Sequence, residues 1–292
     1  MAAIDTALDA VVNKLQFSSM LHSYKGDHLM LGWHFAGTIE KIGDKVENLR
    51  VGDDVFGHLQ YDSKTIQGSF SEYITVPASD CAKKPADVPF DVAAASTTEA
   101  ITALQAVRDH GGFEEAQRIL ILGGGGGVGS AAVQIAKALG ASHITATCSA
   151  RDVERVRSNG ADVVVDRGAK DPKDIQDSFH VVFDSTGLYS AYDFLSKIHK
   201  EGGRFVTTLP NVGFLLATAM TFVNCKKQGV SFVHAMSKRQ DLELVGEWLS
   251  SSKLQIPIDS TFKVKDMKDA MARQADRAKV GRVIIDVANG WE

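Results

Sequence analysis

The sequence predicts a doubly wound parallel α/β fold joined to a smaller antiparallel β domain. Three observations predict it. The middle of the chain alternates short apolar runs with amphipathic stretches, and five glycines follow the first of those runs. The N-terminal part instead consists of short segments punctuated by glycine. With 292 residues the chain is long enough for two domains.

The N-terminal segments GTIEKIGDKV, GDDVFGH and GSFSEYITVP read as strands of the antiparallel domain, and a helical connector begins near Pro85. In the middle, RILIL is suited to a buried parallel strand, and apolar residues at helical spacing follow the glycines. The tail supplies a strand, a helix and a last strand. About six strands are expected in the parallel sheet, including 118–122, 143–148, 163–166, 180–184, 204–208 and 230–233.

Composition and charge exclude several classes of protein. The chain is 44% hydrophobic with a formal net charge of −4, so it lacks the basic excess that holds nucleic acid. Its longest apolar stretch, Val212–Val223, is too short to span a bilayer. The opening residues lack the basic and apolar regions of a secretory signal. Three scattered cysteines indicate a reducing compartment, so we expect a cytoplasmic protein.

The glycine run RILILGGGGGVGS carries the clearest functional signal. Gly124, Gly126 and Gly129 fit the pattern G-x-G-x-x-G, with Gly127 and Val128 between the last two. In that pattern the glycines permit a tight turn, close approach of a pyrophosphate, and close packing of the helix on the strand. The alternative is a flexible loop, but the strand before it and the helix after it favour a dinucleotide site.

The identity of the dinucleotide is predicted from the end of the second strand. An NAD site typically has an acidic side chain there, which binds the ribose 2′-hydroxyl. In this sequence no Asp or Glu occupies that strand end. The local sequence TCSARDVER offers the hydroxyl of Ser149 and the guanidinium of Arg151, which suit a 2′-phosphate. The sequence therefore predicts NADPH as cofactor. The alternative is that Arg151 is a solvated arginine at a helix start.

Several stretches together resemble a known family. They are LGWHFAGTIEKIGDKVENLRVGDDVFGH, GSFSEYITVP, AITALQAV, the glycine run and TCSARDVERVRSNGADVVVD. The chain resembles the zinc-independent medium-chain dehydrogenase/reductases, and among them the NADPH quinone oxidoreductase (zeta-crystallin-like) group. The resemblance implies a Rossmann domain over residues 96–257, inserted into a GroES-like catalytic domain formed by 1–95 and 258–292. It also implies an active site in the cleft between them.

The resemblance implies further cofactor contacts outside the glycine run. Thr102 matches a threonine near the nicotinamide, and Ser185 lies in a loop along the cofactor. Thr207 and Leu209 match the segment beside the carboxamide, and Arg282 matches a basic residue of the tail. For each of these the alternative is an ordinary turn or strand-end residue.

Candidate catalytic residues are fewer. Asn13 matches a segment whose side chains reach the substrate in the family, and Tyr61 is a candidate proton donor, although a surface tyrosine is the alternative. Phe17 and Trp33 are expected to stack on a flat substrate or to pack in the core. Only twelve residues precede Asn13, so the GroES-like domain is expected to be shortened at its N-terminus.

The expected chemistry does not use a metal. His34 is offset by one from the zinc-ligand position of the family, and the cysteines do not cluster. Without a Lewis acid, the substrate must already be electrophilic, such as a quinone or an α,β-unsaturated carbonyl. The alternatives are a carbonyl or enoyl reductase of a biosynthetic pathway, and an NADPH-binding sensor with little activity. The resemblance also implies a homodimer formed through the strand at 230–233.

Overall fold

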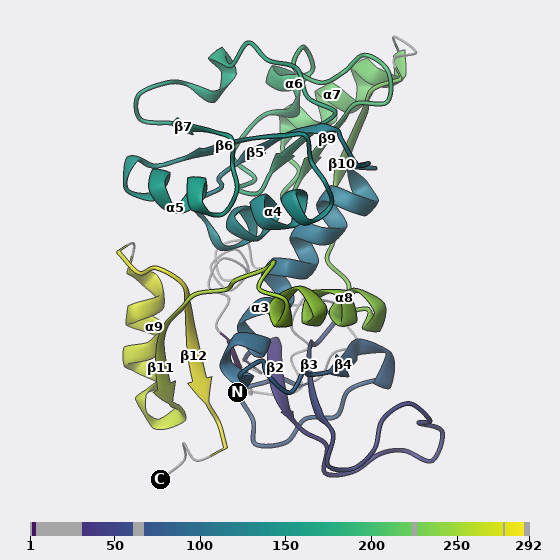
Figure 1. Cartoon of the computed structure of the whole chain (residues 1–292), viewed down its shortest axis with the longest axis vertical. Helices are drawn as coiled ribbons and strands as arrows, with labels where there is room; N and C mark the ends of the chain where they lie inside the picture. Colours follow the sequence, from purple (N-terminus) through teal and green to yellow (C-terminus); the bar gives the residue numbers. More distant parts are fainter. Residues whose placement is uncertain (1, 4–30, 61–66, 224–226, 277, 289–292) are drawn as a thin grey trace. The chain divides into compact units, whose positions relative to one another are not determined.

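The computed structural model describes residues 2–3, 31–60, 67–223, 227–276 and 278–288. The chain divides into two units. In Figure 1 the first unit has the colours from both ends of the sequence bar and the second unit has those of its middle. One unit comprises Met1–Ile101 with Met236–Glu292, and the other comprises Thr102–Ala235. The boundaries expected from the sequence are 95/96 and 257/258, so the structure assigns a further stretch before residue 257 to the first unit.

The second unit is built on a six-stranded parallel sheet. Its strand order is β10-β9-β8-β5-β6-β7, which is the order of a dinucleotide-binding fold. The order reverses between β5 and β8, so the loops after these two strands flank the switch point where such folds bind ligands. The strands are β5 (Arg118–Leu122), β6 (His143–Cys148), β7 (Val163–Asp166), β8 (Val181–Asp184), β9 (Arg204–Thr207) and β10 (Gly229–Phe232).

Helices cover both faces of this sheet. Figure 1 shows α4 (Gly127–Ala138) and α5 (Val153–Ser158) on one face, and α6 (Ala191–Phe194) and α7 (Val212–Val223) on the other. Because successive strand residues point to opposite faces, Leu120 and Leu122 pack against the second pair of helices. All four apolar residues Ile119–Leu122 are fully buried, which explains the continuous apolar run RILIL.

Helix α6 is much shorter than the stretch YSAYDFLSKIHK predicts. After Phe194 the chain turns so that its backbone pairs with Phe179, whose N–H donates to the carbonyl of Lys197 at 2.8 Å. The side chain of Gln228 then donates to the carbonyls of Leu195 and Ile198, each at 2.9 Å. These long-range bonds replace the helical ones, so tertiary contacts override the local helical pattern.

The first unit contains a three-stranded antiparallel sheet, β2-β3-β4, with β2 (His34–Thr38), β3 (Asp54–His58) and β4 (Cys81–Lys83). The segment GSFSEYITVP does not form the third strand. Instead, the side-chain amide of Gln67 bonds both backbone groups of Thr75, donating to its carbonyl and accepting from its N–H. One side chain thus satisfies the backbone that a neighbouring strand would otherwise pair.

The connector after Pro85 forms α3 (Phe90–Leu104), which continues as a π-helix over Gln105–His110. Helix α8 (Arg239–Ser250) belongs to the first unit because Gly246 lets it approach that unit closely. A Cβ built on Gly246 would lie 3.2 Å from Pro85 and 3.6 Å from Phe56. This packing accounts for the difference at the second boundary.

The tail has the expected strand–helix–strand order. Strand β11 (Ile258–Lys263) and strand β12 (Arg282–Asp286) pair in parallel, with α9 (Met267–Ala275) between them in sequence. Strand β1 (Ala2–Ala3) pairs antiparallel with β12 and completes a second three-stranded sheet. Among the described helices, none has both the length and the apolar character needed to cross a membrane.

Candidate functional site

The glycine loop is a tight turn that joins the end of β5 to the start of α4. Gly123 adopts a φ of +91°, a left-handed conformation that favours glycine. The N–H of Gly124 donates to the carbonyl of Thr147 in β6 at 2.8 Å, which fixes the loop against the neighbouring strand. Gly126 is the N-cap residue of α4, and its N–H donates to the carbonyl of Gly123 at 3.0 Å.

The loop leaves space at one glycine and none at another. A Cβ built on Gly126 would meet only the carbonyl oxygen of Gly123, at an ordinary 3.5 Å. A Cβ on Gly129 would lie 2.1 Å from the same oxygen, so Gly129 is required for the helix to pack on the turn. Gly126 therefore faces open space, whereas Gly129 is a packing residue.

The first turn of α4 supplies backbone donors to that open space. The N–H groups at the start of a helix have no partners within it, and here they belong to Gly127, Val128 and Gly129. Gly126 and Gly127 are both exposed. Together with the partial positive charge of the helix end, these groups fit a bound pyrophosphate.

A charged cluster lies where β6 ends. The hydroxyl of Ser149 donates to Asp152 Oδ2 at 2.6 Å, and Arg155 Nη2 donates to Asp152 Oδ1 at 2.7 Å. Arg151 lies nearby, with its Nε 3.5 Å from the same carboxylate and its side chain 57% exposed. Ser149 and Arg151 thus both contact one acidic residue, Asp152.

The loop after β8 is held by a buried carboxylate. Asp184 accepts hydrogen bonds from the Thr186 N–H at 3.0 Å, the Thr186 hydroxyl at 2.6 Å and the Tyr189 N–H at 2.9 Å. Burial raises the pKa of Asp184, while these hydrogen bonds oppose the shift. The hydroxyl of Ser185 donates to the Leu122 carbonyl at 2.8 Å, which ties this loop to the end of β5.

Two of the other predicted cofactor residues lie beside this loop. Thr207 and Leu209 are joined by hydrogen bonds through the threonine hydroxyl, at 3.2 and 3.3 Å. A Cβ built on Gly187 would lie 2.7 Å from the Cβ of Leu209, so the loops after β8 and β9 are in contact. The structure therefore brings Ser185, Thr207 and Leu209 to the carboxyl ends of adjacent strands.

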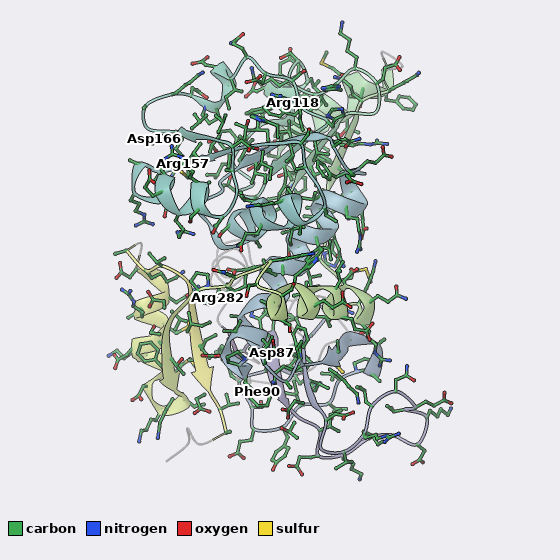
Figure 2. The ribbon with its side chains drawn as sticks, in the orientation of Figure 1. Asp87, Phe90, Arg118, Arg157, Asp166 and Arg282 are labelled. Atoms are coloured by element: carbon green, nitrogen blue, oxygen red, sulfur yellow. The ribbon has the colours of Figure 1, made fainter. Side chains whose placement is uncertain are left out.

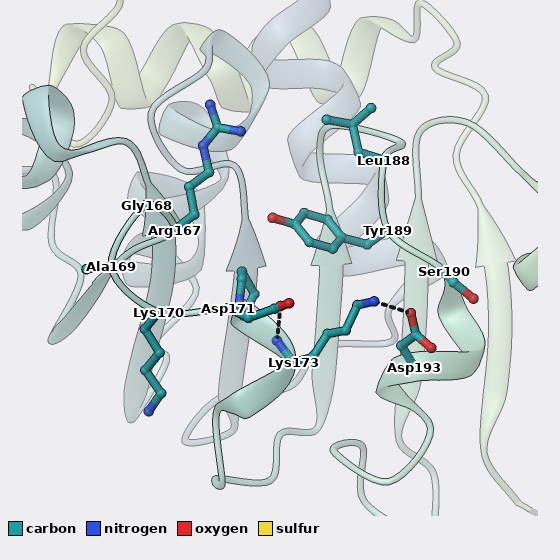
Figure 3. A pocket seen from close by; sticks show the side chains of 11 residues that line it. Arg167, Gly168, Ala169, Lys170, Asp171, Lys173, Leu188, Tyr189, Ser190 and Asp193 are labelled. Carbon is teal, nitrogen blue, oxygen red and sulfur yellow. Dashed lines mark hydrogen bonds and ion pairs between the residues drawn. The ribbon is translucent and has the colours of Figure 1, made fainter.

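A cavity of about 550 Å³ lies between the segments that follow β7 and β8 (Figure 3). Arg167 and Tyr189 line its end nearest the strand termini, and Lys173 pairs with Asp193 across it at 3.0 Å. Burial raises the pKa of Tyr189. Among the predicted residues that the structure describes, only Arg167, which the sequence offers as a second cation near the 2′-phosphate, lines this cavity. Its other lining residues are Gly168, Ala169, Lys170, Asp171, Pro172, Leu188 and Ser190.

The structure places Arg282 inside the first unit, at the start of β12 (Figure 2). Its guanidinium donates to Glu99 Oε1 at 3.2 Å and to His34 Nδ1 at 3.3 Å. Because arginine only donates, His34 Nδ1 is the acceptor, and Nε2 carries the proton that it donates to the Thr98 hydroxyl. Arg282 is thus part of a buried polar cluster. Thr102, one helical turn beyond Thr98 on α3, is also buried.

The predicted substrate residues are mostly outside the described part of the chain. Asn13, Phe17 and Tyr61 lie in the ranges 4–30 and 61–66, which the structure does not describe. Trp33 is described and is 3% exposed, as a core residue would be. Among the described residues, no group of three or more His, Cys, Asp or Glu side chains is arranged to hold a metal ion.

Sequence reasoning missed Asp152 as a site residue. An NAD site is expected to have its acidic residue at the end of β6, whereas Asp152 follows that strand by one turn of 3₁₀-helix, Ala150–Asp152. The signal that reveals it is an acidic residue at the start of a helix, three residues after a serine that its carboxylate can bond.

Comparisons with known proteins agree with this architecture. Residues 9–86 match the family model described as alcohol dehydrogenase GroES-like domain, and residues 159–285 match the one described as zinc-binding dehydrogenase. The chain is 32% identical over 286 residues to the 2-methylene-furan-3-one reductase of Solanum lycopersicum, covering 94% of this chain and 69% of that protein. It is also 32% identical over 263 residues to an Arabidopsis thaliana protein named NADPH-dependent alkenal/one oxidoreductase, chloroplastic, covering 87% of this chain and 63% of the relative.

A solved structure has the same fold. It is an alcohol dehydrogenase superfamily protein from Novosphingobium aromaticivorans, with a TM-score of 0.81 and 26% sequence identity. The alignment covers 97% of this chain and 89% of the other. The strand order, the glycine loop and these matches lead to one conclusion: the chain belongs to the medium-chain dehydrogenase/reductase family, in its zeta-crystallin-like group.

Proposed function

We propose that the chain is an NADPH-dependent oxidoreductase that reduces a quinone or an α,β-unsaturated carbonyl without a metal ion. The observation that carries this proposal is the glycine loop, where an exposed Gly126 and the first turn of α4 form an open cradle of backbone donors. The exposed cation Arg151 stands at the end of the neighbouring strand, where a 2′-phosphate would lie.

The nicotinamide of the cofactor supplies the hydride. The residues of the chain bind the cofactor and the substrate, orient them and exclude water from the site. Orientation accounts for much of the rate enhancement in such a reaction. In this proposal, the N–H groups of Gly127, Val128 and Gly129 hold the pyrophosphate. Ser185, beside the glycine loop, lines the path of the cofactor.

The remaining site residues complete the proposal. Thr102, Thr207 and Leu209 are proposed to lie near the nicotinamide end of the cofactor, and Arg282 is proposed to support that site from its buried cluster. Asn13 is proposed to donate a hydrogen bond to the substrate oxygen, where negative charge develops as hydride is added. Tyr61 is proposed as proton donor. Phe17 is proposed to stack against a flat substrate, whereas Trp33, at 3% exposure, packs in the core.

The names of the relatives support the substrate class. A 2-methylene-furan-3-one contains a carbon–carbon double bond conjugated with a ketone, and the Arabidopsis relative is named for alkenals and alkenones. Such substrates accept a hydride at carbon without prior activation by a Lewis acid, because the carbonyl already draws electrons from the double bond.

The test is oxidation of NADPH, followed by its absorbance, with a panel of quinones, alkenals, alkenones and plain alcohols or ketones. Turnover of the conjugated substrates that survives exhaustive chelation supports the proposal. NADPH binding without turnover of any of them would favour a sensor. Turnover confined to plain ketones, or abolished by chelation and restored by zinc, would contradict it.

We also propose that the chain forms a homodimer through the β10 edge of its sheet. Strand β10 is the last strand of the sheet in the described part of the chain, and an exposed edge strand is a site for pairing. Exposed apolar side chains lie on α7 and β10, and pairing across a two-fold axis would cover them. These are Val212, Leu215, Leu216, Phe222 and Phe232.

Light scattering of the purified protein tests the dimer. Leu216→Glu, on α7, is expected to shift the mass toward that of a monomer, and Val51→Glu, at an exposed apolar residue of the first unit, is the matched control. Equal masses for the two variants and the wild type would contradict this interface. We further propose a cytoplasmic location, supported by the free buried thiols of Cys81 and Cys148, and fluorescent tagging of the full chain checks it.

A further inference from the structure

Asp152 is a buried carboxylate at the place where a dinucleotide fold recognises the adenosine ribose. The residue is only 7% exposed, and its carboxylate accepts the hydroxyl of Ser149 through one oxygen and the guanidinium of Arg155 through the other. Burial raises the pKa of Asp152, but these hydrogen bonds outweigh burial, so its pKa lies below the ordinary value. The group is therefore an anion at neutral pH.

This carboxylate lies directly against the glycine loop. A Cβ built on Gly125 would be 2.8 Å from Asp152 Oδ2, and Arg155 Nη2 also donates to the Gly125 carbonyl at 2.7 Å. A dinucleotide whose pyrophosphate is held by the loop must place its adenosine ribose beside it, at the end of the second strand. Asp152 is an acidic group at that place, against the glycine loop.

The charges of the cluster are divided between its two arginines. Arg155 is fixed by the two acceptors Asp152 and Gly125, so it neutralises the carboxylate and anchors α5 to the loop. Arg151 is more exposed and only 3.5 Å from the carboxylate through Nε, so it is placed to meet an added phosphate. A carboxylate has about four lone-pair positions, and Ser149 and Arg155 use two of them through close contacts.

We propose that Asp152 accepts a hydrogen bond from the 2′-hydroxyl of an unphosphorylated adenosine ribose, so that the protein binds NADH as well as NADPH. The inference rests on the proposed function, because it assumes that the glycine loop holds a nicotinamide dinucleotide. In NADH the ribose hydroxyls need an acceptor, which Asp152 provides. In NADPH the 2′-phosphate pairs with Arg151 and is repelled by the carboxylate of Asp152.

The test measures binding of NADH and of NADPH to the full chain by isothermal titration calorimetry, with no substrate present. Wild-type protein is expected to bind both. Asp152→Asn removes the charge and keeps one acceptor oxygen, which Arg155 can use, while the Ser149 hydroxyl can turn to accept from the new amide N–H. The variant is expected to bind NADH about tenfold more weakly, because a hydrogen bond to a charged group is lost. Its affinity for NADPH is expected to be unchanged or higher.

Glu154→Gln is the matched control. It removes one negative charge from the first turn of α5, the helix that begins directly after Asp152. The Glu154 side chain is 84% exposed and pairs with the surface residue Arg157. The affinity of this variant for either nucleotide should differ from that of the wild type by no more than about twofold, because exposed charges are screened. If Asp152→Asn changes the affinity for NADH and the affinity for NADPH by the same factor, the proposed role of Asp152 is overturned.

The wild type alone also decides the question, whether or not the variant folds. Binding of NADPH without measurable binding of NADH overturns this inference and leaves the proposed function standing. Absence of binding by either nucleotide overturns the proposed function, and the inference falls with it. Because Arg151 is exposed, NADPH binding is expected to weaken more steeply with added salt than NADH binding, and equal salt dependence would contradict the division of roles.

Discussion

Replacing Gly126 by alanine separates the binding role of the glycine loop from its folding role. The new Cβ would contact only the Gly123 carbonyl oxygen at 3.5 Å, and the φ of −83° at this position suits any residue. Loss of chain entropy in the unfolded state stabilises the variant, whereas alanine is a poorer N-cap than glycine. These effects oppose each other, so the free energy of unfolding should change by about 1 kcal/mol or less.

The effect on the cofactor is expected to be much larger. The methyl group would enter the open space at Gly126, which directly precedes Gly127 and Val128, whose N–H groups start α4. Losing one or two hydrogen bonds to a charged phosphate costs roughly 3 kcal/mol in total, which is about a hundredfold in affinity. Titration calorimetry with NADPH measures the affinity, and thermal unfolding without ligand measures the stability.

Gly129→Ala is the contrasting variant. Its Cβ would lie 2.1 Å from the Gly123 carbonyl and 2.8 Å from the Ser185 hydroxyl, so backbone must move. Overpacking of this kind costs about 1–3 kcal/mol of stability. If Gly126→Ala binds NADPH as tightly as the wild type, the pyrophosphate does not lie in this cradle. If Gly126→Ala lowers the free energy of unfolding as much as Gly129→Ala does, a Cβ at position 126 must meet neighbouring atoms, and the space there is not open.

Three further predictions concern the cofactor, the substrate and pH. Arg151→Ala should weaken the binding free energy of NADPH by about 1.5–3 kcal/mol and that of NADH far less, as measured by calorimetry. Equal losses for the two nucleotides would show that Arg151 does not bind the 2′-phosphate. Asn13→Ala should lower the turnover number while the affinity for NADPH stays unchanged, and an unaltered rate would remove Asn13 from the mechanism. The bidentate hydrogen bond from Arg273, at 2.7 and 2.6 Å, lowers the pKa of Asp259 from 3.8 to about 2. The stability it contributes is therefore complete above pH 3.8 and lost as the pH falls through about 2. Denaturant unfolding of Asp259→Asn should lack this part of the acid dependence, and curves parallel to those of the wild type would contradict it.

Much of the second unit follows from local patterns in the sequence. The run RILIL corresponds to the buried central strand β5, because such strands need continuous apolar residues. HITATC corresponds to β6, which is mostly buried, and VVVD to β7 at the end of the sheet, which is more exposed. The glycine loop is equally local, since its turn, its N-cap and its packing all involve residues within a few positions of one another.

Features that depend on distant side chains are not visible in the sequence. Helix α6 ends early because Gln228, far along the chain, bonds the carbonyls that a longer helix would use. The strand expected near Thr75 is replaced by pairing with the side chain of Gln67. Asp152 lies against Gly125 after a 3₁₀ turn, Ala150–Asp152, and the strand pattern of β6 does not predict that turn.

The buried carboxylate of Asp184 has a consequence for how this protein can diverge or be engineered. Three hydrogen bonds from within five residues set the course of its loop, so the loop needs little help from the side chains at its tip. Leu188, at that tip, is 73% exposed and lines the neighbouring cavity. Libraries that vary position 188 while keeping Asp184 should therefore retain folded members at high frequency.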